Sequence, residues 1–541
     1  MPAFETSNSG PRWRFRLETA GLSAALILAV LWVYQPAVHG GWLWDDAQEL
    51  GDNPAMRNGS GLVRLWLGQT GPDYFPMKST VQWLQWHAWG GRVEGYHLTN
   101  IALHAIGSLL VWRIFRRLGI GMAWIGGLWF AVHPLAVESV AWISELKNTL
   151  SLPVLLVSVE AYLRSEQAGP GALAGSSRRW YLVSLIGFAA AMLCKSSVVM
   201  FPVVGLLHAW WRRGRVSWRD LARVAPFLAV SFALGLVTLW LQNHRVLRVA
   251  MGPLSRVSNA GLSLAFYLGK CLWPAGLIPV YSKWRIDPPP LEGYVAWLVL
   301  VALGMLIWRL SRSPGALRNA ARHAGLGLGF FVLMAAPVLG FAPMAYQHFA
   351  WVADHLAYVP LIGIVGLAAG ALSLAPRAFL RWGIGLSVAA AMAVASRREA
   401  RIFAGPECFW SAVEERNPNA AVARINLGYL FLQQGRLDSA LSQLESAVRL
   451  GPDQPEAHNN YASALAQSGR LPEAKNQAEE ALRLKPDYPE AHNNLGLMLL
   501  QKGQIADSIV HFEAAMRLRP DFESAAANLR HARQLQAGAA H

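Results

Sequence analysis

"PRWRFRLETAGLSAALILAVLWVYQPAV", residues 11–38, joins a basic segment to an apolar stretch long enough to cross a membrane. A membrane-spanning α-helix needs about 20 predominantly apolar residues to cross about 30 Å of hydrocarbon. A cleaved signal peptide is disfavoured, because the stretch lacks a small-x-small cleavage site at the right distance and further apolar segments follow it. We therefore interpret residues 11–38 as the first membrane span, with its basic flank in the cytoplasm.

The composition supports a membrane protein with many spans. Of the 541 residues, 54% are hydrophobic and only 15% are charged, which is too apolar for a soluble protein of this length. The net charge of +15 comes from short arginine clusters between apolar segments, as in cytoplasmic loops, so nucleic acid is not an expected partner. The three cysteines form neither a disulfide framework nor a CxxC metal motif.

About eleven spans are expected. After the first, they lie near residues 97–112, 119–132, 149–163, 180–194, 197–211, 222–242, 294–311, 323–343, 357–375 and 380–396. Residues 262–281 are apolar but interrupted by Lys270, Pro274 and Pro279, which predicts a re-entrant pair of short helices on the outer face. The odd number of spans then places the C-terminus outside, whereas a full crossing by residues 262–281 would place it in the cytoplasm.

Beyond residue 400 the sequence becomes polar and repetitive. Proline recurs every 34 residues, and asparagine and glycine follow the same period, at Pro418, Pro452, Pro486 and Pro520, at Asn426, Asn460, Asn494 and Asn528, and at Gly435, Gly469 and Gly503. This is the tetratricopeptide period, which predicts three helical hairpins and a half repeat forming an α-solenoid. We expect the concave face to hold an acceptor polypeptide, with Asn426, Asn460 and Asn494 among its contacts.

The predicted fold is therefore all-α and has two domains. Residues 1–400 form a polytopic transmembrane helix bundle, residues 401–419 a linker, and residues 420–541 the repeat domain. Between the first two spans, Asp45 and Asp46 stand side by side on the outer face. Adjacent carboxylates at that interface can accept a proton from an attacking hydroxyl, and their mutual repulsion favours a raised pKa. The alternative is a solvated acidic turn that caps a short helix.

Five blocks, together with the repeats, resemble a known family. They are "WDDAQELGDNPAMR" at 44–57, "YHLTNIALHAIGSLLVWRIF" at 96–115, "FAVHPLAVESVAWISELKNTLS" at 130–151, "AAMLCKSSVVMFPVV" at 190–204 and "DHLAYVPLIGI" at 354–364. The chain resembles the transmembrane, tetratricopeptide-containing O-mannosyltransferase family. That resemblance implies a GT-C type glycosyltransferase, which moves a sugar, mannose or another hexose, from a polyprenyl-phosphate carrier to protein Ser or Thr hydroxyls outside the membrane.

The resemblance also implies roles for particular residues. Asp45 and Asp46 match the family's catalytic acids, and His133, Glu138, Lys195 and His355 match its donor-binding or phosphate-binding positions. Two positions depart from the family pattern: Ser196 replaces an acid after the lysine, and His355 stands where an arginine is usual. The alternatives are a helix-capping loop for His133 and Glu138, and a snorkelling lysine for Lys195.

Three functions compete at this point. The first is the protein glycosyltransferase, and the second is a related transferase with a lipid or glycan acceptor, for which a peptide-binding solenoid would have no use. The third is a membrane-anchored scaffold without catalysis. Such a scaffold would not need acidic residues at the outer interface. No His or Cys spacing predicts a metal site, although the paired acids leave a divalent cation open. The residue usage favours a bacterial inner membrane with a periplasmic repeat domain.

Overall fold

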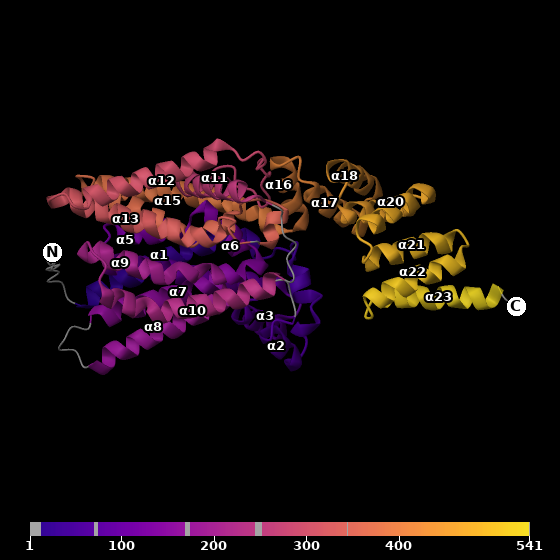
Figure 1. Ribbon diagram of the computed structural model, residues 1–541, viewed down its shortest axis with the longest axis horizontal. Helices are drawn as coiled ribbons and strands as arrows, with labels where there is room; N and C mark the ends of the chain where they lie inside the picture. Colours follow the sequence, from indigo (N-terminus) through magenta and orange to yellow (C-terminus); the bar gives the residue numbers. More distant parts are fainter. Residues whose placement is uncertain (1–11, 70–73, 168–173, 244–250, 343, 540–541) are drawn as a thin grey trace. The chain divides into compact units, whose positions relative to one another are not determined.

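The computed structural model describes residues 12–69, 74–167, 174–243, 251–342 and 344–539 (Figure 1). Every regular element within these residues is a helix, which confirms the all-α fold class. The chain forms two compact units, Met1–Gly405 and Pro406–His541, and each is described by itself.

The first unit is a bundle of long helices with shorter ones between them. Its α-helices are α1 (Arg12–Tyr34), α2 (Gly59–Trp66), α3 (Pro76–Trp89), α4 (Val93–Arg117), α5 (Ala123–Ala131), α6 (Val137–Ala141), α7 (Leu146–Gln167), α8 (Ala174–Cys194), α9 (Phe201–Arg213), α10 (Trp218–Asn243), α11 (Pro253–Leu272), α12 (Leu291–Leu310), α13 (Gly315–Ala335), α14 (Leu361–Leu372) and α15 (Ala378–Ala400). Short 3₁₀ and π turns connect several of them and carry some of the polar residues discussed below.

Each of the eleven expected spans contains a helix, but the helices differ in length. In the described part of the chain, α1, α4, α10, α12, α13 and α15 are long and apolar enough to cross a membrane, and a bent pair that includes α6 and α7 would be a seventh. In contrast, α5, α9 and α14 have only 9, 13 and 12 residues. The expected number of spans is therefore approximate, because about 20 residues are needed to cross.

The expectation for residues 262–281 was wrong. Instead of two short helices, one 20-residue helix, α11, begins at Pro253 and ends at Leu272, and residues 273–290 are not helical. The helix ends there because Pro274 cannot continue it and disfavours helical geometry at the residue before it. Lys270, which was expected to interrupt the helix, lies in its last turn and donates to the carbonyls of Ala275 and Gly276 at 2.5 and 3.0 Å.

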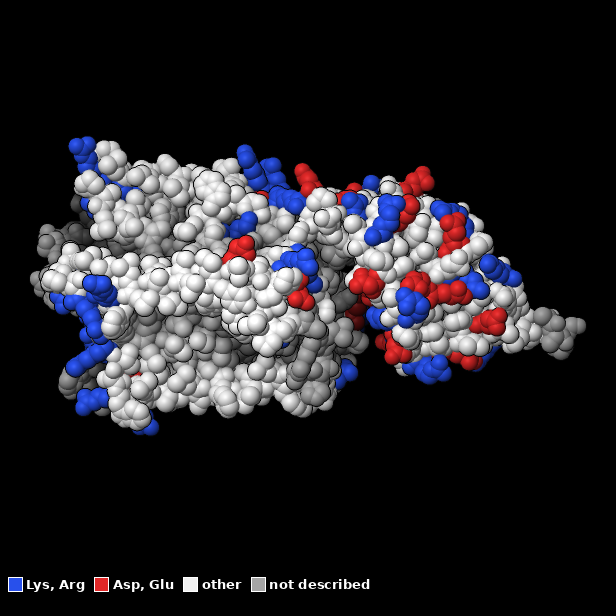
Figure 2. Space-filling view, turned by 45° about the horizontal axis from the view of Figure 1, so that its top comes forward, with Lys and Arg blue, Asp and Glu red and all other residues white. Residues whose placement is uncertain are grey.

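Helix α4 connects two chemically different ends of the first unit. Near its start, Glu94 lies 3.7 Å from His39, and near its end Arg113 and Arg117 pair with Glu160 at 3.1 and 3.3 Å. Arginines gather at this second end, which is the left-hand end in Figure 2. Those with partners in residues 160–166 are Arg113, Arg117, Arg164, Arg212 and Arg223.

The chain leaves the first unit at the other end, where α1 also finishes. Arg397 of α15 donates to Gln35 Oε1 at 2.8 Å, and the ring of Phe403, in the turn η10 (Arg401–Ala404), lies 6.5 Å from the ring of Trp142. The first residues beyond α15 are therefore at the end of the bundle opposite to the one where Arg113 and Arg117 pair with Glu160.

The second unit confirms the predicted repeats. It contains α16 (Pro406–Arg416), the hairpins α17 (Ala421–Gln433) and α18 (Leu437–Leu450), α19 (Pro455–Gln467) and α20 (Leu471–Leu484), α21 (Pro489–Gln501) and α22 (Ile505–Leu518), and a last helix α23 (Glu523–Ala539). Each hairpin turn has its periodic glycine at positive φ, 72° at Gly435, 80° at Gly469 and 76° at Gly503. Glycine adopts this geometry without the penalty that other residues incur, which explains the period.

Residues 401–419, expected as a linker, are mostly helical. They contain η10 and α16, and α16 belongs to the second unit, where Phe409, Trp410 and Val413 are buried. The division between the two units falls after Gly405. Composition alone places the change near residue 400 but does not reveal that α16 packs with the repeats.

Candidate active site

Asp46 is buried between the loop after α1 and the turn η5 (Ile143–Glu145). Its Oδ2 accepts a hydrogen bond from Leu43 N at 2.8 Å, and its Oδ1 accepts one from Ser144 N at 2.8 Å and another from Ser144 Oγ. Burial, followed by the charge of Asp45, raises the pKa of Asp46, while the hydrogen bonds from Ser144 and Leu43 oppose this shift. Both carboxylate oxygens of Asp46 therefore have partners inside the protein.

Asp45 has a different environment, although it is the adjacent residue. It is partly exposed, and its Oδ1 is buried without a hydrogen-bond partner among the described residues. Burial, and then the nearby negative charge of Glu49, raise the pKa of Asp45 to about 7, while the positive charges of Lys147 and Lys78 oppose the shift. Of the two acids, Asp45 therefore has the oxygen that can accept a proton near neutral pH.

A buried ion pair holds the element that follows Asp45. Glu49, in the π-helical turn η2 (Ala47–Gly51), accepts from Lys78 Nζ of α3 at 2.5 Å and from Gln82 Nε2 at 3.0 Å. Both side chains of the pair are largely buried. Lys78 was not among the predicted site residues, because it lies more than thirty residues from Asp45 in a segment without a recognisable motif.

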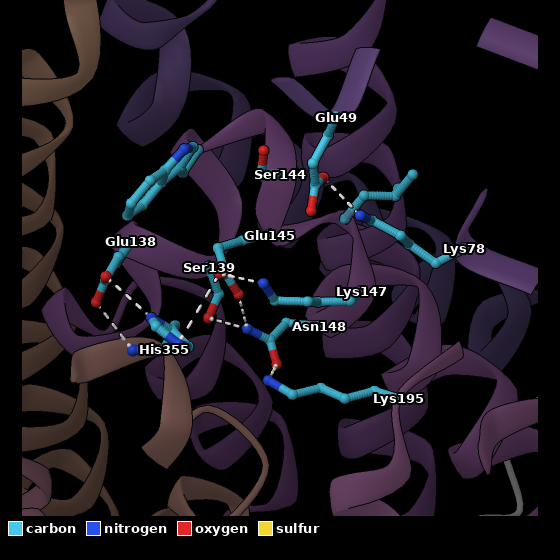
Figure 3. Close-up of polar contacts among 12 residues, drawn as sticks. Glu49, Lys78, Glu138, Ser139, Ser144, Glu145, Lys147, Asn148, Lys195 and His355 are labelled. Atoms are coloured by element: carbon cyan, nitrogen blue, oxygen red, sulfur yellow. Dashed lines mark hydrogen bonds and ion pairs between the residues drawn. The ribbon is translucent and has the colours of Figure 1, made fainter. Parts of the chain in front are cut away.

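The segment between α5 and α7, here called the second loop, contributes the next polar residues of the cluster. Every residue from 125 to 146 is buried, although this segment includes several polar side chains. Glu145 Oε1 lies 3.0 Å from Lys147 Nζ, and Glu145 Oε2 accepts from Asn148 Nδ2 at 2.5 Å. Asn148 Oδ1 in turn accepts a hydrogen bond from the buried Lys195 Nζ (Figure 3). The structure thus connects Lys195 and Lys147 to the hydrogen-bonded pair of Asn148 and Glu145, while phosphate binding by Lys195 stays a prediction.

Glu138 and His355 meet from distant parts of the sequence (Figure 3). Glu138 Oε1 lies 3.0 Å from His355 Nδ1, and Glu138 Oε2 accepts from the backbone N of His355 at 3.0 Å. The other ring nitrogen of His355, Nε2, lies 3.9 Å from Glu145 Oε1. These two expected donor-site residues are therefore neighbours, and Glu138 fixes the orientation of the imidazole toward Glu145.

Asp354, the residue before His355, belongs to a second buried contact. Its Oδ1 accepts a hydrogen bond from Tyr281 OH at 2.8 Å. Burial, followed by the charge of Glu138, raises the pKa of Asp354 well above its ordinary value. This contact ties the turn η9 (Asp354–Ala357), and with it His355, to the non-helical segment after α11.

His133 has a backbone partner at each ring nitrogen. Nδ1 accepts from Leu135 N at 3.2 Å, which caps the turn η4 (Pro134–Ala136), and Nε2 lies 3.2 Å from the carbonyl oxygen of Cys271. A neutral imidazole satisfies both contacts, with Nε2 as the donor. The structure therefore places His133 where it ties the second loop to α11, and donor binding by this residue stays a prediction.

The three repeat asparagines occupy equivalent places on the first helices of their hairpins and are partly exposed. Asn426 Nδ2 donates to Val422 O at 2.7 Å, and Asn460 Oδ1 lies 3.4 Å from Asn459 Nδ2. Asn494 Nδ2 donates to Asn459 Oδ1 at 2.9 Å, which joins α21 to α19. Their contact with an acceptor stays a prediction, whereas a structural role for Asn494 is visible.

The cluster combines a proton acceptor with cations. Asp45 supplies a carboxylate oxygen to which no described residue donates a hydrogen bond, and Lys147 and Lys195 supply positive charge beside Glu145 and Asn148. Such a set suits a reaction in which a hydroxyl loses a proton while an anionic group leaves. In the part of the chain that the structure describes, no three His, Cys, Asp or Glu side chains are grouped to hold a metal ion.

Comparisons with known proteins agree with both units. Models described as tetratricopeptide repeat match residues 408–455, 425–474 and 489–522, and one described as TPR repeat matches 462–503. Protein O-mannosyl-transferase TMTC4 of Mus musculus is 24% identical over 394 residues, covering 60% of this chain and 52% of the mouse protein. Protein O-mannosyl-transferase Tmtc3 of Drosophila melanogaster is 24% identical over 538 residues, covering 80% of this chain and 56% of the fly protein.

Two solved structures are also similar. The crystal structure of ArnT from Cupriavidus metallidurans bound to undecaprenyl phosphate is 15% identical, with a TM-score of 0.36, and the match covers 85% of this chain and 79% of ArnT. The crystal structure of MamA is 22% identical, with a TM-score of 0.23, covering 24% of this chain and 77% of MamA. The chain spans about half the length of the mouse and fly relatives. The chain is thus similar in sequence to proteins named protein O-mannosyl-transferases, and its C-terminal part matches tetratricopeptide repeats.

Proposed function

We propose that this protein is an integral-membrane glycosyltransferase that moves a hexose, in the first instance mannose, from a polyprenyl-phosphate carrier to Ser or Thr hydroxyls of proteins. The observation that carries the proposal is the unpartnered Oδ1 of Asp45 at a site that also holds Lys147 and Lys195. The names of the relatives support the same reaction class.

In the proposed reaction, the acceptor oxygen forms a bond to the anomeric carbon of the sugar as the bond from that carbon to the phosphate oxygen breaks. The hydroxyl proton moves to Asp45, whose pKa of about 7 suits a base that works near neutral pH. The polyprenyl phosphate leaves with the bonding electrons. Lys147 and Lys195 stabilise the charge that develops on it, and His355 borders the same site.

The charge distribution supports an external site. Cytoplasmic loops of membrane proteins are enriched in Lys and Arg, and the arginines gather at the end of the bundle opposite to Asp45. The site would then face the periplasm of a bacterial inner membrane. Because the chain leaves α15 at the end that carries Asp45, the repeats would begin on the same side as the site.

The test compares Asp45→Asn with a matched variant in the same loop, Asp52→Asn, whose side chain is exposed. The assay mixes the purified full-length protein with a polyprenyl-phosphate mannose donor and a peptide rich in Ser and Thr. Loss of a general base slows a reaction by about 10² to 10⁴-fold, so Asp45→Asn should lose transfer to this extent. Asp52→Asn should keep the wild-type rate.

The proposal fails if Asp45→Asn is folded, binds the donor and transfers sugar at the wild-type rate. Folding is checked by size-exclusion chromatography and thermal unfolding in detergent. If the wild-type protein transfers mannose to lipid or glycan acceptors but not to protein, the proposed acceptor is wrong. The proposed role of Asp45 is unaffected by that result.

We also propose that the solenoid presents the acceptor polypeptide, because the exposed parts of Asn426 and Asn460 lie on the first helices of successive repeats. Changing both to Ala should raise the KM for the acceptor peptide and leave the KM for the donor unchanged. The matched control is Arg483→Gln, on the second helix of its hairpin, where the side chain is exposed. Equal acceptor KM values in all three proteins would exclude this role.

A further inference from the structure

Leu43, Trp44, Asp45 and Asp46 form a tight turn that is closed in both directions. Asp46 N donates to Leu43 O at 2.7 Å, and Leu43 N donates back to the Asp46 side chain at 2.8 Å. Trp44 and Asp45 are therefore the central residues of the turn and stand at its tip, while Leu43 and Asp46 form its base. A carboxylate that accepts from the backbone N–H three residues earlier makes such a turn rigid.

The base of this turn is fastened to the second loop. Ser144 gives two hydrogen bonds to Asp46 Oδ1, one from its backbone N and one from its hydroxyl, and both residues are fully buried. The loop that carries Ser144 is itself anchored, because Asn100 Nδ2 of α4 donates to Trp142 O at 2.9 Å. Asp46 is thus connected to the helix bundle through Ser144.

The tip of the turn is held in a strained conformation. Trp44 has φ of 36°, in the left-handed region that residues other than glycine rarely adopt. Its ring stacks on that of Trp142 with centroids 5.9 Å apart, and it forms a T-shaped pair with Phe349 with centroids 4.7 Å apart. Strain of this kind persists only where the surrounding contacts determine it, and it is frequent at active sites.

We infer that Asp46 and Ser144 are positioning residues that act through Asp45, whereas Asp45 alone of the two aspartates is the general base. This inference rests on the proposed function for its kinetic consequence. The Asp46–Ser144 contact fixes the base of the turn, and the turn then sets the position of Asp45 relative to Glu49, Lys78 and Lys147, whose charges act on it. An Asp46 with both oxygens engaged does not itself bind the acceptor or a cation.

The kinetic test is a double-mutant cycle in the full-length protein with Ser144→Ala and Asp45→Asn. Ser144→Ala removes one hydrogen bond to a charged group, so kcat should fall about tenfold while the KM for the polyprenyl-phosphate mannose donor stays within about twofold. In the Asp45→Asn background, Ser144→Ala should cause no further loss. If Ser144→Ala lowers the residual rate of Asp45→Asn by the same factor as that of the wild type, Ser144 does not act through Asp45 and the inference is overturned.

A second measurement does not depend on activity. Amide hydrogen exchange of the peptide that covers residues 42–50 should be slow in the wild type and in Asp45→Asn, and faster in Ser144→Ala and Asp46→Asn. Unchanged exchange in Asp46→Asn overturns the inference, even if transfer is observed. Conversely, Asp45→Asn with a full transfer rate refutes the proposed function, and the exchange rates still decide whether Asp46 and Ser144 hold the turn.

Discussion

At the scale of single residues, Asp45 and Asp46 show how far two identical neighbours can diverge. One is at the tip of a turn near charged side chains from η2, α3 and α7, and the other is at its base with both oxygens engaged. Glu138 resembles Asp46 in this respect, because both of its oxygens accept from His355. Among these three acids, the one whose Oδ1 has no hydrogen-bond partner in the described residues, Asp45, is the candidate reactive group. Asp46 and Glu138, with both oxygens hydrogen-bonded, orient other groups.

The pH dependence of transfer should report the environment of Asp45. A general base must be ionised, so with a pKa of about 7 the rate should fall as the pH drops below 7. The charge of Glu49 raises this pKa, and that of Lys78 lowers it. We therefore expect Glu49→Gln to move the acid limb of the kcat profile to lower pH and Lys78→Met to move it to higher pH.

The control for these profiles is Asp52→Asn, which should leave the limb in place because Asp52 is exposed and is not among the groups that shift the pKa of Asp45. A limb that moves in the same direction in Glu49→Gln and Lys78→Met would contradict the electrostatic explanation. Such a result would point instead to loss of the contact between η2 and α3.

Sequence patterns located part of this cluster. Asp45, Glu138, Lys195 and His355 are expected from the resemblance, and the structure places each of them at the contacts described above. Lys147 could have been noticed, because it stands between Glu145 and Asn148 in a mostly apolar segment. Ser144 and Lys78 could not, since a buried serine hydroxyl and a lone lysine in a helix have no distinguishing pattern, and only the fold brings them to Asp46 and Glu49.

At the scale of elements, the repeat hairpins match large and small residues across each helix pair. A Cβ on Gly428 would lie 2.4 Å from Leu444, and one on Gly496 would lie 2.7 Å from the ring of Phe512. In the middle repeat the equivalent residues, Ala462 and Ala478, are both of intermediate size and share one buried cluster. Close packing between the helices thus explains why glycine occurs at this position only opposite a bulky side chain.

Gly496→Ala should therefore destabilise the third hairpin. Overpacking of this kind costs about 1 to 3 kcal/mol, measured as the loss in the free energy of unfolding of residues 406–541 expressed alone. In a Phe512→Ala background, which recreates the Ala462 and Ala478 arrangement, the same change should cost almost nothing. An equal cost in both backgrounds would rule out the contact with Phe512 as the cause.

The third hairpin should also be sensitive to acid. His492 Nδ1 lies 3.0 Å from His511 Nδ1, and burial lowers the pKa of both residues, with the charge of His492 adding to the effect at His511. The unfolded chain therefore binds more protons than the folded one below the ordinary histidine pKa of about 6.5. The free energy of unfolding should fall as the pH drops from 7 through that value.

His511→Gln provides the matched variant, because it recreates the pair of the second repeat, where His458 Nδ1 lies 2.6 Å from Gln477. Urea denaturation of residues 406–541 between about pH 7 and pH 5 should show a smaller loss of stability in this variant. A pH dependence equal to that of the wild type would assign the sensitivity to other groups.

Helices were predicted correctly from the sequence where the repeat period or a long apolar stretch marked them. The repeat period located α17 to α22 because each hairpin needs the same turn glycine and the same small residues. Hydropathy located the long helices but not the lengths of α5, α9 and α14, since apolar content continues into turns whose residues are buried by the bundle rather than by lipid. The single helix α11 was missed because Lys270 was expected to interrupt it.

At the scale of the whole chain, the distribution of charge should fix the orientation in the membrane. We expect an alkaline phosphatase reporter fused after Gly405, at the end of the bundle that carries Asp45, to be active outside the cytoplasm. The same reporter fused after Arg215, between α9 and α10 at the arginine-rich end, should be inactive. The reason is that arginine-rich loops are retained in the cytoplasm during insertion.

Activity of the second fusion and inactivity of the first would reverse the orientation and place the site in the cytoplasm. A cytosolic fluorescent reporter at the same two positions provides the reciprocal control, since it should be bright only after Arg215. The order of membrane bundle and solenoid was predictable from composition and period, but the end at which α15 finishes required the contacts of Arg397 and Phe403.

The uninterrupted burial of residues 125–146 bears on how the proposed transfer competes with hydrolysis of the donor. Water is also a hydroxyl compound, and it competes with the acceptor for the same anomeric carbon. In the proposed reaction, a segment packed in the interior of the bundle would limit the water that reaches the reacting atoms from that side, so the donor would persist until a protein hydroxyl arrives. Polar residues of this segment, such as Glu145, would then act where water competes poorly with the acceptor.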